Sequence, residues 1–333
     1  MVTIKDVARL SGVSISTVSR VINDSKPVSP EIRKKVLEVI DETGYRPNDV
    51  ARSLVTRRSY LIGVIVNDLS NTYVAEMVKG VEEVGKMYNY DILLCSSYYD
   101  KEAQMNHLSL LNRKQAEGII LIGYRFDEEI VEKVNEYNKN SIYFTRDIKN
   151  DKIDHVKIDS HAASYEMTKY LINEGHKKIA FISDFEDRGS YEQDKIDGYK
   201  EALKENELDY SRVFVAGGRR YNFGYDIAHE VVAEIENITA VFCTNDELAI
   251  GLINYLFDNG YKVPDDVSVV GYGNYKESQY VRPTLTTISE PYYDIGAVSI
   301  RTLIKKIEGD KDQPSVVELP FSFIKRDSVK KRD

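Results

Sequence analysis

The feature of the sequence that most constrains its fold is a regular alternation of short apolar runs with amphipathic stretches from Leu61 onward. Apolar runs of this length are typical of parallel strands buried on both faces, and the stretches between them have helical spacing. Two sets of four runs occur, at 61–66, 90–97, 118–123 and 141–146 and then at 178–184, 212–218, 238–245 and 267–273. This repeated alternation predicts an α/β protein with two doubly wound parallel-sheet lobes.

The first 60 residues carry a different pattern, that of three short helices around one small core. Thr3, Ser14 and Ser29 each have the spacing of a helix N-cap, and a proline follows the last of them at the first helical position. Glycines at positions 12 and 44 permit a tight turn and a helix stop. Apolar residues recur at helical spacing in each segment, which predicts a three-helix head.

Charge divides the chain at the same place. The whole sequence has a formal net charge of -9, but residues 1–60 hold eleven Lys and Arg against seven Asp and Glu, a net charge of +4. The rest of the chain therefore carries -13. A basic head on an acidic body is typical of a protein whose small domain binds a polyanion.

The second helix of the head leaves a polar face outside its apolar stripe of Val18, Val21 and Ile22. An α-helix fits the major groove of DNA, where Arg bonds guanine and hydroxyl groups reach bases or phosphates. A plain three-helix bundle with a polar outer face is the alternative. We predict that Ile15, Ser16 and Arg20 read bases and that Thr3, Ser14, Thr17, Ser19, Asn23 and Arg52 contact the DNA backbone.

The stretch IKDVARLSGVSISTVSRVIN, followed by YRPNDVARSL, resembles the LacI/GalR family of bacterial transcription regulators. The resemblance implies a helix-turn-helix head, a hinge helix and two periplasmic-binding-protein-like lobes with a cleft between them. It also implies a homodimer on a pseudo-palindromic DNA operator. The expected divisions are a DNA-binding domain at 1–46, a hinge and linker at 47–60 and an effector-binding and dimerisation core at 61–333, with lobe 1 over about 61–160 and 292–322 and lobe 2 over about 161–290 and 323–333.

The segment after Pro47 is predicted to form a very short helix that Asn48 caps and that runs through Leu54. One or two helical turns do not persist alone in water, so something must hold them. The resemblance implies that this hinge helix pairs across a dimer axis through Ala51 and Leu54 and enters the minor groove. Leu54 would then prise a base step apart as an apolar wedge. The alternative is a plain interdomain linker.

Polar side chains follow the ends of several predicted strands, where ligands of open α/β sheets bind. The predicted effector-cleft residues are Asp68, Asn71, Tyr73, Arg146, Asp184, Lys195, Asp246 and Asn274. Ordinary helix capping is the alternative role for each Asp and Asn. Lys195 stands where sugar-responsive relatives usually carry Arg, and Gly273 where they commonly carry Asp, which argues against a free sugar as the principal effector.

A stretch near the C-terminus, VRPTLTTISEPYYDIGAVSIRTLIKKI, resembles the carbon catabolite control branch of this family, as does MYNYDILL at 87–94. The resemblance implies that the phosphocarrier protein HPr, phosphorylated on a serine, docks on Asp294, Arg301 and Lys305. Arg301 and Lys305 are one helical turn apart, a spacing that suits a dianionic phosphate. A solvated, lysine-rich helix face is the alternative.

The sequence also argues against other classes of protein. Cys95 and Cys243 lie far apart and form neither a metal spacing nor a disulfide framework, and no catalytic constellation emerges. We find no signal pattern and no apolar run of membrane-spanning length. We therefore expect a cytoplasmic repressor without metal or cofactor, not an enzyme. Two alternatives stay open: a repressor of a local catabolic operon controlled by a small polar ligand, and a binding or enzymatic α/β protein with a fused helical head.

Overall fold

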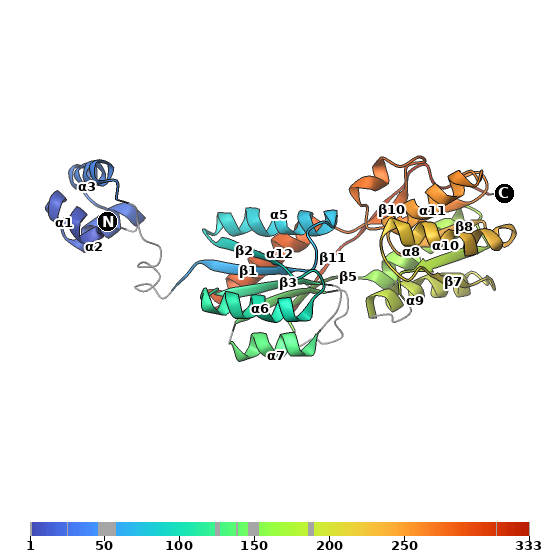
Figure 1. Cartoon of the computed structure of the whole chain (residues 1–333), viewed down its shortest axis with the longest axis horizontal. Helices are drawn as coiled ribbons and strands as arrows, with labels where there is room; N and C mark the ends of the chain where they lie inside the picture. Colours follow the sequence, from blue (N-terminus) through green and yellow to red (C-terminus); the bar gives the residue numbers. More distant parts are fainter. Residues whose placement is uncertain are drawn as a thin grey trace. The chain divides into compact units, whose positions relative to one another are not determined.

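The computed structural model describes residues 2–24, 26–45, 58–123, 127–137, 139–145, 153–185, 190–310 and 312–332. The chain consists of two compact units, Met1–Ser59 and Tyr60–Asp333 (Figure 1). The first unit is the predicted helical head, and the second holds both parallel sheets.

The head contains α1 (Ile4–Ser11), α2 (Ile15–Asn23) and α3 (Pro30–Thr43). The predicted N-caps of α2 and α3 are confirmed, because the Ser14 hydroxyl accepts a hydrogen bond from the Thr17 amide and the Ser29 hydroxyl accepts one from the Ile32 amide. Glycines after α1 and α3 adopt the left-handed conformation, with φ of 66° and 61°. The buried core of the head consists of Val7, Ala8, Val18, Val21 and Val36.

Lobe 1 is built on a parallel sheet with the strand order β11-β5-β4-β3-β1-β2. Its strands are β1 (Leu61–Val66), β2 (Asp91–Ser96), β3 (Gly118–Gly123), β4 (Asn140–Thr145), β5 (His155–Ile158) and β11 (Val316–Leu319). Helices α5 (Thr72–Met87) and α12 (Tyr292–Ile307) pack on one face, and α6 (Lys101–Arg113) and α7 (Glu128–Glu136) cover the other. The register places Val64 opposite Leu94 and Ile120.

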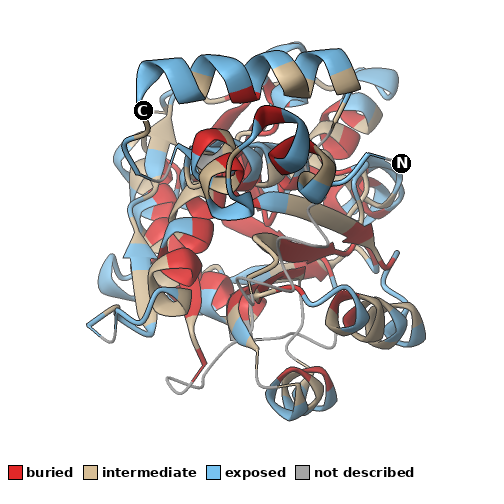
Figure 2. Ribbon diagram, turned by 90° about the vertical axis from the view of Figure 1, so that its left-hand side faces the viewer, coloured by how far each residue is buried: buried red, intermediate tan, exposed pale blue. Residues whose placement is uncertain are grey.

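Lobe 2 repeats this plan with the strand order β12-β10-β9-β8-β6-β7. Its strands are β6 (Ile179–Ser183), β7 (Arg212–Val215), β8 (Ala240–Cys243), β9 (Ser268–Tyr272), β10 (Thr286–Ser289) and β12 (Ser322–Ile324), the last antiparallel to β10. Helices α8 (Ser160–Asn173) and α9 (Ser190–Glu205) pack on one face, and α10 (Tyr221–Ala233) and α11 (Asp246–Asp258) on the other. Figure 2 shows buried residues on strands and inward helix faces and exposed residues on outer helix faces.

The two lobes are joined by chain segments that pass from one sheet to the other. The chain leaves lobe 1 between β5 and α8, returns between β10 and α12, and leaves again between β11 and β12. The predicted doubly wound architecture is therefore confirmed. Two short 3-10 helices, η1 (Ile235–Asn237) and η2 (Lys276–Gln279), complete the described elements of lobe 2.

Four short strands were not predicted from the sequence. They are β5, β10, β11 and β12. The strands are only three or four residues long, and polar residues interrupt them, as in TTIS at β10 and VVEL at β11. A short run of this kind lacks the continuous apolar signal of a buried strand. The predicted strand at 212–218 is also shorter, because β7 ends at Val215.

Helices α5 and α12 approach so closely that their backbones touch at glycines. A Cβ atom on Gly296 would collide with the carbonyl oxygen of Met77, and one on Gly80 with the carbonyl oxygen of Tyr293. Gly85 differs, because its added Cβ would lie 2.8 Å from the terminal methyl group of Ile300, which can rotate away. The position of α12 on lobe 1 thus depends on glycine at positions 296 and 80.

We predict that Gly296→Ala lowers the free energy of unfolding by about 3 kcal/mol, because helix backbones must separate to admit the methyl group. Gly85→Ala should cost about 1 kcal/mol or less, since a side-chain end yields and alanine favours helix by a similar amount. Urea unfolding followed by circular dichroism measures both. Equal losses of unfolding free energy in the two variants would contradict the close contact between the two helix backbones.

Candidate functional site

The outer face of α2 presents the predicted base-reading residues. Ile15 is 45% exposed, and Ser16 and Arg20 are exposed one turn apart. The Ser14 hydroxyl lies 2.7 Å from the Ser16 hydroxyl and 2.8 Å from that of Thr17, so three hydroxyl groups form one cluster at the helix start. A hydroxyl cluster at a helix N-terminus, with a guanidinium one turn along, can donate hydrogen bonds to phosphates and base edges.

The other residues predicted to contact DNA differ in their bonding and burial, and several lie outside the described residues. Thr3 donates from its hydroxyl and its amide to the Asp6 carboxylate, at 2.7 and 3.0 Å, and these bonds lower the pKa of Asp6. Ser19 is half-buried, and Asn23 is the last residue of α2, with its side chain outside the described residues. The hinge residues Asn48, Ala51, Arg52 and Leu54 also lie outside the described residues.

The end of β1 places three predicted effector residues where the lobes meet. Asp68 accepts hydrogen bonds from the Ser70 amide at 2.8 Å and from Arg220 of lobe 2 at 2.9 Å. The Tyr73 ring stacks on the Tyr275 ring, with centroids 5.6 Å apart. Asn71 donates from its amide to the Tyr99 hydroxyl at 3.3 Å. We call Asp68, Ser70, Tyr73 and Tyr99 of lobe 1, together with Arg219, Arg220 and Tyr275, the lobe junction.

The lobe 2 side of the junction contains two arginines that sequence reasoning missed. Arg219 pairs with the buried carboxylate of Asp184, and Arg220 donates to Glu247 at 3.2 Å as well as to Asp68. Both arginines follow β7, so the rule that selected the other strand ends also applied to them. The junction therefore carries paired charges of both signs.

Two predicted effector residues are bonded within lobe 2. Lys195 has no exposed surface; its ammonium group donates to the Thr244 carbonyl at 2.8 Å and lies 3.8 Å from the centroid of the Tyr272 ring. The Asn274 side chain donates to Ser289 at 3.2 Å and accepts from Arg326 at 2.6 Å. These contacts hold the strand ends together. Arg146 lies outside the described residues.

Asp246 is fully buried at the start of α11. Its carboxylate accepts from the Tyr275 amide and from the Thr287 hydroxyl, each at 2.6 Å. Burial raises the pKa of Asp246 to about 7, and these hydrogen bonds counteract only part of that rise. The carboxylate thus ties the α11 turn to β10 and to the residue that stacks on Tyr73.

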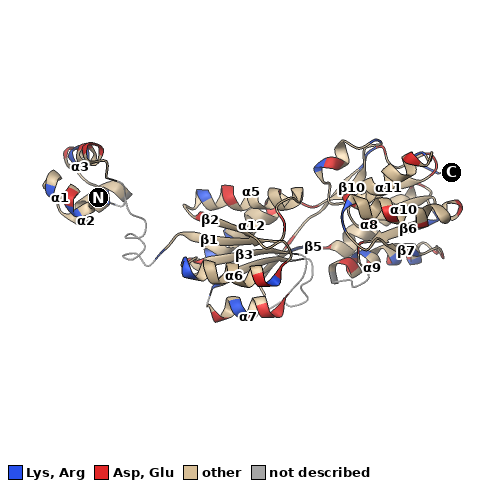
Figure 3. Cartoon of the chain, in the orientation of Figure 1, with Lys and Arg blue, Asp and Glu red and all other residues tan. Residues whose placement is uncertain are grey.

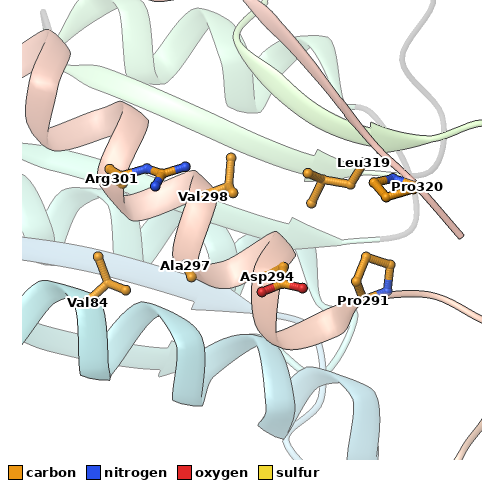
Figure 4. A pocket seen from close by; sticks show the side chains of 8 residues that line it. All are labelled: Val84, Pro291, Asp294, Ala297, Val298, Arg301, Leu319 and Pro320. Carbon is orange, nitrogen blue, oxygen red and sulfur yellow. The ribbon is translucent and has the colours of Figure 1, made fainter.

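A pocket of about 280 Å³ lies beside α12 in lobe 1 (Figure 4). Its lining residues are Val84, Pro291, Asp294, Ala297, Val298, Arg301, Leu319 and Pro320. Asp294 and Arg301, two of the predicted docking residues, are exposed, and Figure 4 shows Ala297 and Val298 between them. Lys305 is half-buried one turn beyond Arg301. The pocket lining therefore combines apolar side chains with a carboxylate and a guanidinium.

Comparison with known proteins identifies the family of the chain. Residues 3–48 match the bacterial regulatory proteins of the lacI family, and residues 59–327 match the periplasmic binding proteins and sugar binding domain of LacI family. The chain belongs to the LacI family. It is 38% identical over 330 residues to catabolite control protein A of Priestia megaterium, covering 99% of both chains. It is 34% identical over 340 residues to the HTH-type transcriptional repressor PurR of Vibrio parahaemolyticus, again covering 99% of both.

The solved structures include the lac repressor dimer bound to operator and the anti-inducer ONPF, with a TM-score of 0.86, 24% identity and 99% of each chain covered. This similarity supports the fold. As a LacI-family protein, the chain is a DNA-binding transcriptional regulator, and its relatives are regulators rather than enzymes. No helix in the described parts of the chain is long and apolar enough to cross a membrane. The described residues also include no group of three or more acidic, His or Cys side chains that could hold a metal.

We predict that Asp246→Asn removes a pH dependence of stability. The folded wild-type carboxyl binds a proton more readily than the unfolded one, so its stability falls as pH rises from about 4 to about 7. Relative to the variant, the free energy of unfolding of the wild-type chain should fall by roughly 1 kcal/mol for each pH unit in this window. Urea unfolding at several pH values tests this, and parallel curves for the two proteins would contradict it.

Proposed function

We propose that this LacI-family regulator is a homodimeric repressor in carbon catabolite control, with serine-phosphorylated HPr as its corepressor. The assignment of a phosphoprotein corepressor rests on the α12 face, where exposed Asp294 and Arg301 line an apolar pocket. The similarity to catabolite control protein A over the full chain supports the same setting.

DNA recognition is assigned to the exposed face of α2. Ser16 and Arg20 project from a helix that Val18 and Val21 anchor in the core, so their direction is fixed by the fold of the head. Figure 3 shows the Lys and Arg residues on the helices of this unit. One head offers too few base contacts for useful selectivity, so we propose that two heads bind the half-sites of a pseudo-palindromic operator.

The hinge is assigned to the minor groove of the same operator. Asn48, Ala51 and Leu54 are proposed to form a helix there that pairs with its copy in the partner subunit, with Leu54 as the wedge. Arg52 is proposed to contact phosphate, as are Thr3, Ser14, Thr17, Ser19 and Asn23. Since such a protein must reach the chromosome, we place it in the cytoplasm.

We predict that Arg20→Ala weakens binding to the operator by about tenfold to a hundredfold, because a guanidinium that reads a base is lost. Binding to a scrambled duplex of the same length should fall far less. Fluorescence anisotropy at matched salt, with an operator selected from random palindromes, measures both. Lys34→Ala is the control, since it removes one exposed positive charge from α3 and should affect both duplexes alike.

The docking face fits a phosphoprotein better than a neutral ligand. A phosphoserine carries nearly two negative charges, which the Arg301 guanidinium can receive through two hydrogen bonds, with Lys305 one turn away. Asp294 offers a carboxylate to a cationic group of the same partner. Val84, Val298 and Leu319 leave an apolar depression that can receive a hydrophobic side chain, as the core of a protein interface requires.

We predict that Arg301→Ala reduces the affinity for serine-phosphorylated HPr by about tenfold or more, because the phosphate loses a charged hydrogen-bond donor. Calorimetric titration of the full chain measures this. Lys262→Ala, which removes an exposed positive charge from lobe 2, is the control and should bind as wild type does. Absence of binding to the wild-type chain, or equal binding of unphosphorylated HPr, would overturn the corepressor assignment.

A small polar effector at the lobe junction is the second candidate. The charged side chains of Asp68, Arg219, Arg220 and Glu247 favour it, since they come from strand ends of both lobes. Asn71, Tyr73, Arg146, Asp184, Lys195, Asp246 and Asn274 stay proposed members of that site. Titration with sugars and sugar phosphates provides the test, and heat from these compounds but not from the phosphoprotein would favour local control of a catabolic operon.

A further inference from the structure

One guanidinium group joins the two lobes directly. Arg220 precedes α10 in lobe 2, and its Nη2 atom donates to Asp68 and to the Ser70 hydroxyl of lobe 1, each at 2.9 Å. Its Nη1 atom donates to Glu247 of its own lobe at 3.2 Å. The arginine therefore bonds to both lobes at once, across about 150 residues of sequence.

The members of this contact differ in their exposure to solvent. The Asp68 side chain is 14% exposed and that of Glu247 is 22% exposed, whereas the Arg220 side chain is 41% exposed. An ion pair with one exposed member remains open to screening by salt, so the strength of this contact depends on ionic strength. Glu247 lies in the first turn of α11, so its bond to the guanidinium lies within lobe 2 and does not require lobe 1.

The Arg220 contact differs in kind from the aromatic contact between the lobes. Tyr73 and Tyr275 stack through apolar ring faces, so their attraction depends little on ionic strength. If the lobes separate, Arg220 keeps Glu247 but loses Asp68 and Ser70. The free energy of those lost bonds therefore enters the equilibrium between joined and separated lobes directly.

We propose that Arg220 is an interlobe latch: its bonds to Asp68 and Ser70 hold the lobes together through groups of the chain itself, with a strength set by ionic strength. The latch needs neither DNA nor a phosphoprotein, so it stands apart from the proposed corepressor. It gives the core a preference for joined lobes. An effector at the junction must either bind the joined lobes or supply the free energy that separates them.

The test is single-molecule energy transfer on the full chain, with dyes on cysteines introduced at Asn135 in lobe 1 and Lys204 in lobe 2. Both positions are exposed, and the native Cys95 and Cys243 are buried. Only a small fraction of the chains is labelled, so each dimer carries at most one dye pair. The ratio of joined to separated lobes is then read from the distribution of transfer efficiencies.

Arg220→Gln and Asp68→Asn should each lower that ratio by about threefold to tenfold, and the double variant should be no lower than either single one. Arg212→Gln, which breaks an ion pair with Glu234 inside lobe 2, is the matched control and should leave the ratio unchanged. Raising potassium chloride from about 0.05 to about 0.5 M should lower the ratio in wild type but not in Arg220→Gln.

The salt series needs no substitution at the latch residues themselves, beyond the two dye-labelled cysteines, and so separates the latch from a folding defect. A ratio that is independent of salt in wild type, or single-variant effects that add in the double variant, would overturn the latch. An unchanged ratio in Arg220→Gln would do the same. Operator and HPr binding can fail or succeed without altering these outcomes.

Discussion

Burial of parallel strands on both faces is the constraint on which the rest of the core depends. A strand such as β1 or β8 has no exposed face, so helices must cover both sides of each sheet, and polar groups can reach solvent only at the strand ends. The carboxyl ends of parallel strands lie along one edge. Topology therefore places Asp68, Asp184 and Asp246 at the carboxyl edges of their sheets.

The same constraint explains how much could be predicted from the sequence. Continuous runs such as LIGVIV gave the central strands, and capping residues such as Ser14 and Ser29 gave the helix starts of the head. The edge strands β11 and β12 were missed because tertiary pairing, not local pattern, makes VVEL and SFI into strands. Residues at strand ends could be selected, but their partners could not, because Arg220 and Asp68 meet across two separate lobes.

Charge pairing changes what the junction can recognise. Arg219 and Arg220 already bond to Asp184, Asp68 and Glu247, so a ligand there must exchange one set of charged hydrogen bonds for another. Such an exchange yields little net affinity for a neutral polyol, whose hydroxyl groups form weaker bonds than a carboxylate does. The absence of the usual sugar-binding Arg and Asp at Lys195 and Gly273 is consistent with this.

Helix α12 links the proposed dock to the lobe junction. It begins at Tyr292, whose ring lies 5.3 Å from that of Tyr73 and 6.4 Å from that of Tyr275, and Asp294 follows two residues later. Gly296 fixes the same turn against the backbone of α5. If a phosphoprotein binds Asp294 and Arg301 more tightly when the lobes are joined, linkage requires that it stabilise the joined lobes by the same factor. The Arg220 latch would then lower the free energy that the corepressor must supply, since part of the preference for joined lobes is already built into the chain.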